Sequence, residues 1–543
     1  MRKYIGISLL LACFLGTSGC TTDYYYGDDQ YYKGDIWVEE QSVLNGAPLM
    51  ENKGIYSIYE DELKHIYLKI QEGYVKETEE RFTYSYLKNY TWSDWQDGTE
   101  PFVNVIMTDG TDKESSTLEG FGFGEMTPNA RMTVKGSRNR IQSRSYQVKL
   151  YERAGLYEGQ RTLNFIKNNG DLSRIKIKLG LDLASRFPDA ASLRTEFVRL
   201  FVYDTTEGGI LKWVDQGVYT LVEQPNKAYL SSHGLDENGT LYRAEDFAFE
   251  NEDSLLPMDH PSYNNTAFEE LLAIREAENH DKILEVLDVL ERQEVSMEEI
   301  LSLYFEEENL LTYAAWSVMM HNVEAGTKDY LIYSPKNSKT FYFIFENFRN
   351  AFEEEMKGYG FLLNNKVFRL YLEEEDNRIK LMNKVKELRG ILTDDLLNDT
   401  VYKYKQEILS SLYSMPEINL LPGAAKDVEP YMEEMIKKIK EAESFNYRVK
   451  VPYIESYTRD GSIVKLDFDR EAGYSYEAII SADRRFEEIV ATIPLSGDTF
   501  SYTLSGTFYV RLTAVAPDGT RVFCGNISKD ILGRDVYGGL EIE

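Results

Sequence analysis

The sequence KGSRNR at residues 135–140, followed by RSYQVKL at residues 144–150, joins a cluster of cations to a strand pattern. Residues 131–135 and 146–150 alternate apolar and polar side chains, which predicts two half-exposed strands. Cations on such strands either form ion pairs on exposed faces or bind an anion, and the pattern alone leaves both interpretations open.

The residues around this stretch divide the chain by type. Residues 37–160 are mainly of strand type, and residues 194–224 return to strands after a helical segment at 171–187. From about residue 265 to residue 445 the pattern is mostly helical, with two short apolar strand-like runs between residues 330 and 345. These patterns predict an α+β fold.

One helix of this region has a clear start signal. Ser296 and Glu299 form a capping box, in which each side chain binds the backbone N–H of the other residue. Apolar residues recur from Leu303 to Val318, so one helix is expected to run across the core.

The chain changes character after Val451-Pro452. Short strand-like runs alternate with turns through residues 451–543, which resembles a fibronectin type III or immunoglobulin-like all-β sandwich. Cys524 follows one of these runs and is expected to be buried and inert. Three cysteines without a Cys/His cluster predict neither a disulfide framework nor a structural zinc site.

Length and charge narrow the function. The chain has 543 residues, with 91 Asp and Glu against 60 Lys and Arg, so its net charge is −31. This balance argues against a nucleic-acid-binding protein and against a polybasic attachment to anionic lipid. A hydrophobic fraction of 43% is that of a globular protein.

The amino terminus has the pattern of an export signal. Arg2 and Lys3 precede an apolar run at residues 5–15 that is too short to span a membrane. Small residues then lead to Cys20, as in bacterial lipoprotein signals. We therefore expect residues 1–20 to be a signal peptide and Cys20 to carry lipid, with an ordinary signal peptide as the alternative.

The segment after this cysteine is expected to be a flexible tether. Residues 21–36 are acidic and rich in Tyr. An acidic stretch soon after the lipidated cysteine resembles the surface-export signals of some bacterial lipoproteins. The expected location is the outer surface of the cell envelope, with lipid as the only attachment to the membrane.

Five short motifs follow one another in a fixed order. They are KGSRNR with RSYQVKL at 135–150, LN at 163–164, DLSR at 171–174, GVYTLVEQ at 217–224 and GTLYR at 239–243. This order resembles the CotH (spore coat protein H) kinase family. The resemblance implies a CotH kinase-like domain at residues 101–450, preceded by an N-terminal β-rich region at 37–100 and followed by the sandwich at 451–543.

The resemblance also implies a fold and an activity. Family members have an atypical protein-kinase-like fold, with a β-rich N-lobe and a helical C-lobe, and transfer phosphate from ATP to protein Ser residues. An active member would therefore use ATP and Mg²⁺. Glu223 would pair with one cation of the strand pair, like the lysine–glutamate pair of protein kinases. The cations available for nucleotide phosphates are Arg138, Arg140, Arg144 and Lys149.

The first catalytic motif of the family is altered in this chain. It corresponds to HNVEAGTKDYLIY at residues 321–333, where Glu324 stands at the position of the catalytic Asp. Asp329 stands at the position of a metal-binding Asn. Glu324 could still act as a base and Asp329 could still bind a metal, although the longer arm of Glu moves its carboxylate.

The second catalytic motif departs further from the family. It corresponds to FENFRNAFE at residues 345–353, and one alignment places Asn347 and Arg349 at the two Asp positions. A shift by one residue uses Glu346 as the first carboxylate but restores no second one. The candidate metal ligands are therefore Asp329, Glu346 and Asn347. Because Mg²⁺ needs anionic oxygen ligands, these substitutions predict a degenerate metal site.

Three functions are compatible with this sequence. The first is a kinase-like domain that acts as a binding or scaffold module for a protein or polysaccharide at the cell surface. The second is an active protein Ser kinase with rewired metal ligands Glu324, Asp329 and Glu346. The third is a glycan- or protein-binding adhesin that shares only the fold with kinases.

Overall fold

The structure of the chain is a computed structural model. All described residues belong to one unit of the chain, Ser42–Glu543. The predicted signal peptide, the tether and the predicted site residues Cys20, Arg138 and Arg140 lie outside the described residues. The described residues are 45–57, 62–91, 100–110, 120–136, 144–208, 211–292, 294–354, 357–495, 497–503, 506–529 and 535–542.

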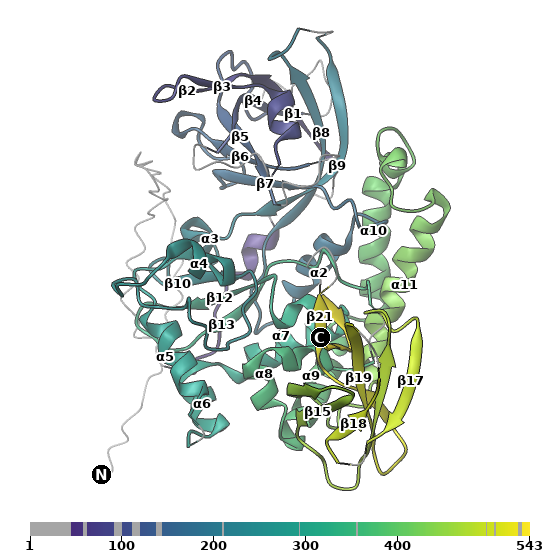
Figure 1. Ribbon diagram of the computed structural model, residues 1–543. Helices are drawn as coiled ribbons and strands as arrows, with labels where there is room; N and C mark the ends of the chain where they lie inside the picture. Colours follow the sequence, from purple (N-terminus) through teal and green to yellow (C-terminus); the bar gives the residue numbers. More distant parts are fainter. Residues whose placement is uncertain are drawn as a thin grey trace, which may run out of the picture. The chain divides into compact units, whose positions relative to one another are not determined.

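Seven strands close into a barrel, in the order β1-β4-β5-β6-β7-β9-β8 (Figure 1). Neighbouring strands are antiparallel, except that β1 and β8 are parallel. Alternate side chains point inward and fill the barrel with an apolar cluster that includes Ile66, Val148 and Leu200. The barrel strands are β1 Lys64–Gln71, β4 Val103–Gly110, β5 Ala130–Lys135, β6 Ser145–Leu150, β7 Thr162–Ile166, β8 Thr195–Asp204 and β9 Trp213–Glu223.

The boundary predicted at residue 100 falls inside this barrel. Strand β1 pairs with β4 on one side and with β8 on the other, so it is part of the same sheet as the strands after residue 100. Residues before β1 contact the helical part instead: the Asn52 N–H donates to the His233 carbonyl at 2.8 Å, and Leu49 is buried in the main core. The described residues between 45 and 91 are therefore divided between the barrel and the helical part.

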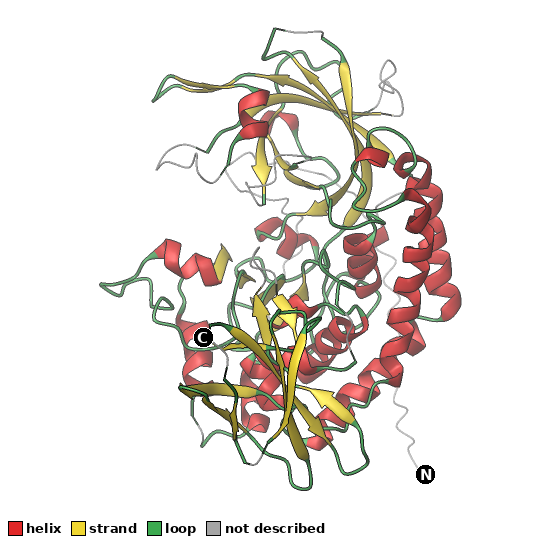
Figure 2. Ribbon diagram, turned by 45° about the vertical axis from the view of Figure 1, so that its right-hand side comes forward, coloured by secondary structure: helices red, strands yellow, loops and turns green. Residues whose placement is uncertain are grey.

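A second sheet and most helices build the main core (Figure 2). The sheet has the order β11-β10-β12-β13, and its last two strands confirm the strand-like runs predicted between residues 330 and 345. Helix α7 has 13 residues, of which 11 are buried, so it has almost no solvent-facing side. The sheet strands are β10 Thr240–Ala244, β11 Leu272–Glu276, β12 Tyr330–Ser334 and β13 Tyr342–Phe345.

The helices vary widely in length. None of those described combines the length and the apolar composition that crossing a membrane requires. They are α1 Tyr84–Asn89, α2 Lys176–Ala184, α3 Lys227–Ser232, α4 Asn265–Leu271, α5 Asp281–Leu290, α6 Met297–Tyr304, α7 Glu307–Met319, α8 Lys366–Tyr371, α9 Glu375–Ile391, α10 Asp394–Leu412 and α11 Val428–Glu441.

The single helix predicted from Ser296 to Val318 is two helices. The capping box of Ser296 and Glu299 is confirmed and starts α6. Helix α6 stops before Phe305, whose backbone is extended. The Glu306 side chain then caps α7 by accepting hydrogen bonds from the backbone N–H groups of Glu308 and Asn309. The sequence pattern missed this break because apolar residues occur on both sides of it.

Residues after 453 form β-sheets. One sheet has the order β14-β15-β18, and the other has the order β17-β16-β19-β20, with β23 paired to β19. Both contribute to one apolar cluster, and Cys524 is fully buried in it, as predicted. The fibronectin or immunoglobulin class stays a prediction. The strands are β14 Ile454–Asp460, β15 Ile463–Phe468, β16 Ser475–Ser481, β17 Ile489–Pro494, β18 Thr499–Ser501, β19 Phe508–Val515, β20 Arg521–Phe523 and β23 Leu540–Ile542.

Two neighbouring side-chain amides connect these sheets to the centre of the helical part. Asn364 Nδ2 donates to the Gly525 carbonyl at 2.7 Å. Asn365 Nδ2 donates to the Gly326 carbonyl at 2.9 Å, in the short 3₁₀ turn Val323–Gly326 that carries Glu324. These two neighbouring residues therefore link the C-terminal part of the chain to the turn that carries Glu324.

Candidate functional site

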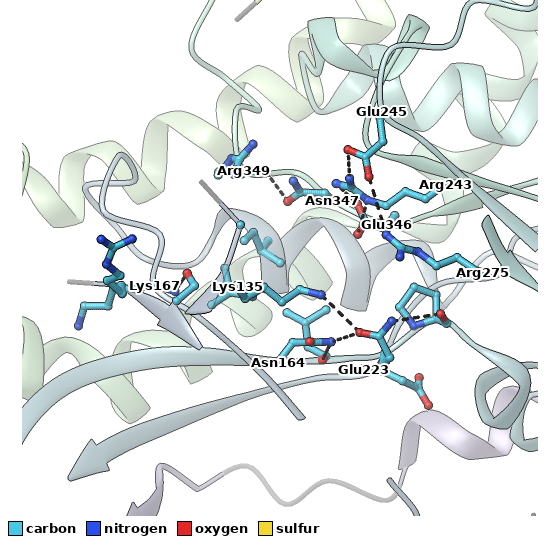
Figure 3. Close-up of a pocket in the computed structure, with 18 of the residues that line it drawn as sticks. Lys135, Asn164, Lys167, Glu223, Arg243, Glu245, Arg275, Glu346, Asn347 and Arg349 are labelled. Carbon is cyan, nitrogen blue, oxygen red and sulfur yellow. Dashed lines mark hydrogen bonds and ion pairs between the residues drawn. The ribbon is translucent and has the colours of Figure 1, made fainter. Parts of the chain in front are cut away.

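A cavity of about 340 Å³ opens between the barrel and the sheet of β10 to β13 (Figure 3). One wall comes from β5, β6, β7 and β9 of the barrel, and the other comes from β10, β11 and the residues after β13. The chain passes between the two walls through Gln224 and Pro225, which follow β9 and also line the cavity.

Lys135, the last residue of β5, is the cation of the barrel wall that points into the cavity (Figure 3). Its ammonium group donates to Gln224 Oε1 at 3.4 Å, and Asn164 Nδ2 donates to the same oxygen at 3.0 Å. Burial, together with the nearby guanidinium of Arg275, lowers the pKa of Lys135 to about 8. With this pKa the amine is only partly protonated near pH 8, so a bound anion would favour its charged form.

Of the four cations predicted as partners of Glu223, the two that the structure describes, Arg144 and Lys149, do not pair with it. Glu223 does not pair with a cation of the β5–β6 strands but accepts from Arg194 Nε at 2.9 Å and from the Arg194 backbone N–H at 3.1 Å. His233 Nε2 lies 2.9 Å from Glu223 Oε2, the oxygen that also accepts from the Arg194 backbone N–H, and His233 Nδ1 lies 2.7 Å from Glu51 Oε1. Burial alone would raise the pKa of Glu223, but His233 and Arg194 lower it to about 2.

The described cations predicted for phosphate binding are placed differently from the expectation. Arg144 lines the cavity, but its guanidinium donates to the carbonyls of Lys88 and Tyr90 and so ties the barrel to the end of α1. Lys149 is exposed on β6 and does not line the cavity. Neither residue therefore offers the charge to the cavity that the strand pattern suggested.

The opposite wall is organised around Arg243, at the end of β10. Its guanidinium donates to Asp329 Oδ1 at 2.8 Å and pairs with Glu346 Oε1 at 3.0 Å. It also forms an ion pair with Glu245. Asn347 Nδ2 donates to the other oxygen of Asp329 at 3.0 Å. The structure thus brings together the three predicted metal ligands, Asp329, Glu346 and Asn347, but a side-chain cation already stands among them.

The predicted catalytic residue, Glu324, lies next to Asp329 but outside the lining of the cavity. It is 4% exposed and does not line the cavity. Asn350 Nδ2 donates to it at 2.6 Å, and it is hydrogen-bonded to Asp329. Burial and the neighbouring carboxylate of Asp329 raise the pKa of Glu324, whereas Arg243 and Arg349 lower that of Asp329 against the effect of burial. The pair therefore favours a protonated Glu324 bonded to an ionised Asp329.

The residues present do not fit a Mg²⁺ ion. Such an ion needs free carboxylate oxygens in nearly octahedral arrangement. Here the carboxylates of Asp329 and Glu346 accept hydrogen bonds from Arg243, and Asn347 gives its amide nitrogen to Asp329. In the part of the chain that the structure describes, no three His, Cys, Asp or Glu residues are grouped so as to hold a metal.

Several residues of the cavity were missed by sequence reasoning. Lys135 opens the KGSRNR motif and Arg243 closes GTLYR, so both stood within quoted motifs without being assigned a role. Arg275 on β11 stands in no motif. Figure 3 shows Arg243 and Arg275 on the wall that faces Lys135.

A family model described as CotH kinase protein matches residues 132–460. The matched range includes both walls of the cavity, from Lys135 to Arg349, and ends with strand β14. No curated protein matches the chain.

Proposed function

Because the chain belongs to the CotH kinase family, we propose that it keeps the family's cavity as a binding site but does not transfer phosphate. CotH kinases generally use ATP and Mg²⁺. Phosphoryl transfer depends on cations that neutralise the phosphates and on a group that takes the proton of the acceptor hydroxyl. Both requirements can be compared with the geometry of the cavity.

The observation that carries the proposal is the position of Arg243. It binds Asp329, Glu346 and Glu245 at once, so carboxylate oxygens that would otherwise bind a metal already contact a side-chain cation. A divalent ion would have to displace this guanidinium and would face its repulsion at short range. The arrangement favours a metal-independent site.

The state of Glu324 supports the same proposal. A general base must be unprotonated and within reach of the hydroxyl that it activates. Glu324 is buried behind the cavity, and its raised pKa favours the protonated form. It serves better as a hydrogen-bond donor that holds Asp329 in place.

The remaining parts of the chain agree with a binding module at the cell surface. The proposed lipid at Cys20 would hold the protein at the cell envelope, and the proposed partner is a protein or a polysaccharide. The C-terminal sheets contact the turn that carries Glu324 through Asn364 and Asn365, so they form part of the same structural unit. These sheets would present the kinase-like part rather than act alone.

One observation favours an active kinase as the second candidate. Asp329 and Glu346 converge on a single guanidinium, so a rotation of Arg243 would leave two carboxylates facing one point. In that case the γ-phosphoryl group would pass from ATP to a protein Ser hydroxyl, which yields ADP and phosphoserine and releases the hydroxyl proton to Glu324.

A transfer assay decides between the two candidates. The full chain is incubated with γ-phosphate-labelled ATP, Mg²⁺ or Mn²⁺, and a Ser-rich acceptor protein, beside the variant Glu324→Gln. We expect equal background labelling for both proteins. Labelling by the wild type that the variant loses would establish the active kinase and overturn the proposal.

A further inference from the structure

We propose that the cavity binds the phosphate chain of a nucleoside triphosphate through Lys135, Arg275 and Arg349, without a divalent cation. This inference rests on the proposed function, because it concerns the same cavity. It replaces the metal by side-chain cations as the partners of the phosphates.

The charge of the cavity differs in sign from that of the chain. Six of the lining side chains are Lys or Arg and three are Glu, although the whole chain has a net charge of −31. A local excess of cations in an acidic protein must be stabilised by an anion or by internal pairing. Which cations are internally paired therefore decides what the cavity attracts.

Three of the six cations are already bound by protein groups, two of them by carboxylates. Arg243 holds the carboxylates of Asp329, Glu346 and Glu245. The Lys167 ammonium is fully buried against Glu417, and the Arg144 guanidinium donates to backbone carbonyls. These residues shape the walls of the cavity, but their N–H donors are directed to protein groups.

The other three cations are paired less completely, although Arg349 is close enough to Asp329 to lower its pKa. Among the described residues, neither Lys135 nor Arg349 forms an ion pair, and the buried Nε of Arg349 has no hydrogen-bond partner. Arg275 lies 3.8 Å from Glu245, a carboxylate that it shares with Arg243. The three come from β5, from β11 and from the segment after β13, so they approach the cavity from different directions.

This arrangement suits a chain of phosphates. Guanidinium groups bind phosphate oxygens through paired N–H donors, and an ammonium group adds a point charge. Three separated cations match an anion with several charged groups better than a single carboxylate. The same cations repel Mg²⁺, so a metal-free phosphate chain is the better ligand.

Apolar residues of β7, β9, helix α2 and the segment after β9 also offer a place for the base of a nucleotide. Ile166, Ile177, Val222 and Pro225 line the cavity and supply the apolar surface that a base requires. This surface distinguishes a nucleoside triphosphate from an inorganic phosphate chain. Inorganic tripolyphosphate, which has the charges without the base, is therefore the comparison ligand.

Isothermal titration calorimetry of the full chain tests the inference. ATP is titrated in EDTA and again in excess Mg²⁺, and tripolyphosphate is titrated in EDTA. We expect ATP to bind in EDTA at least as tightly as with Mg²⁺, and tripolyphosphate to bind more weakly. Binding of ATP that requires Mg²⁺, or no binding in either buffer, would overturn the inference. If tripolyphosphate bound as tightly as ATP, the part of the inference that concerns the nucleoside would be wrong.

Single substitutions identify the residues that bind the ligand. Lys135→Gln, Arg275→Gln and Arg349→Gln should each weaken ATP binding in EDTA by about tenfold or more, the usual effect of losing a charged hydrogen bond. The matched control is Lys437→Gln, which removes an ammonium group that is 71% exposed on α11. Thermal unfolding of each variant shows whether it is folded, and unchanged affinity in all three folded variants would contradict the assignment.

The two proposals fail in different ways. Labelled phosphate on the acceptor protein would refute the loss of transfer but not metal-free binding. Strictly Mg²⁺-dependent binding without transfer would refute the present inference and leave the proposed function in place.

Discussion

The Arg243 guanidinium donates to the Asp329 carboxylate, with 2.8 Å between Nη2 and Oδ1, at the point where the predicted metal ligands meet. The same guanidinium contacts Glu346 at 3.0 Å. A positive side chain thus stands where the family would be expected to hold a divalent ion. It keeps the acidic residues together without a metal, and this relationship has measurable consequences for stability, metal binding and ligand binding.

The substitution Arg243→Gln should destabilise the protein and create a metal requirement. It leaves Asp329 and Glu346 close together without a cation, and breaking a buried ion pair in this way costs about 3–5 kcal/mol. We expect a lower free energy of unfolding in chemical denaturation, and a thermal midpoint that Mn²⁺ raises in the variant but not in the wild type.

The control for this substitution is Arg292→Gln. Arg292 is 57% exposed and pairs with Asp288 on the surface of α5, so its loss should change the free energy of unfolding by less than about 1 kcal/mol. An Arg243→Gln protein as stable as this control, or indifferent to Mn²⁺, would show that Arg243 does not stand in for a metal.

Ligand binding should depend on pH through Lys135. Its pKa is about 8 in the free protein, because burial and the facing cations Arg275 and Arg243 outweigh the facing carboxylates Glu346 and Glu245. A bound polyanion favours the protonated form, so affinity should be constant below pH 8 and should fall above it by up to about tenfold per pH unit.

Calorimetry of ATP binding in EDTA between pH 6.5 and pH 9.5 provides this measurement. The Lys135→Gln variant has no ammonium group to titrate at this position, so its affinity should be lower and nearly independent of pH. The same decline in both proteins would assign the pH dependence to another group.

The buried network around Glu223 should stabilise the fold in a pH-dependent way. The pKa of Glu223 is lowered from 4.5 to about 2, so its ionised form contributes about 3 kcal/mol above pH 4.5, and the contribution is lost as the pH falls toward 2. Glu223→Gln should therefore be less stable by about this amount at pH 7. The difference from wild type should shrink between pH 4.5 and pH 3, as measured by denaturant unfolding at each pH. A constant difference would show that Glu223 acts through packing instead.

His233 in the same network has the opposite pH dependence. Burial lowers its pKa, but Glu223 and Glu51 outweigh this effect and raise it above 6.5. The contribution of the imidazolium is complete below pH 6.5 and disappears as the pH rises through the raised value. His233→Gln should therefore lose the most stability in mildly acidic buffer and less in alkaline buffer, which denaturant unfolding across this range measures. Equal losses at all pH values would contradict a charged His233.

Some features of the fold and the site follow directly from sequence. The alternation around residues 131–135 and 146–150 predicted two strands, which are β5 and β6. The motif order correctly identified the family, and Glu324, Asp329 and Glu346 lie in one region, as the aligned motifs implied. These features depend on short-range periodicity and on the order of motifs, which a sequence displays.

Other features depend on contacts between distant residues. The parallel pairing of β1 with β8 closes the barrel between strands more than a hundred residues apart in the sequence. No local sequence pattern predicts this pairing. Arg144 is directed away from a ligand because carbonyls at the end of α1 capture its guanidinium. Arg275 reaches the cavity only through the pairing of β11 with β10. The order of charged residues along the chain does not predict which cations will line the same cavity.

The junction between the barrel and the helices should be sensitive to Gly217. This residue has a φ of +81°, and a methyl group there would run into the Glu417 carboxylate, which binds Lys167 and the Val218 N–H. Gly217→Ala should cost about 2 kcal/mol or more in the free energy of unfolding.

A second glycine serves as the control for this substitution. Gly390 lies in α9 with no atom near the position of an added methyl group, so Gly390→Ala should leave stability unchanged or raise it by up to about 1 kcal/mol. Equal effects of both substitutions in denaturant unfolding would show that the Glu417 contact is not important for the junction.

The most direct test of the central claim is electron paramagnetic resonance of Mn²⁺ added to the full chain, with and without ATP. Each titration is compared with the same solution lacking protein. If Arg243 occupies the place of the metal, the protein should not reduce the Mn²⁺ signal below that of the protein-free solution in either case. Loss of signal from one Mn²⁺ per chain at micromolar concentration, especially with ATP present, would show that Asp329 and Glu346 still bind a metal and would contradict the account.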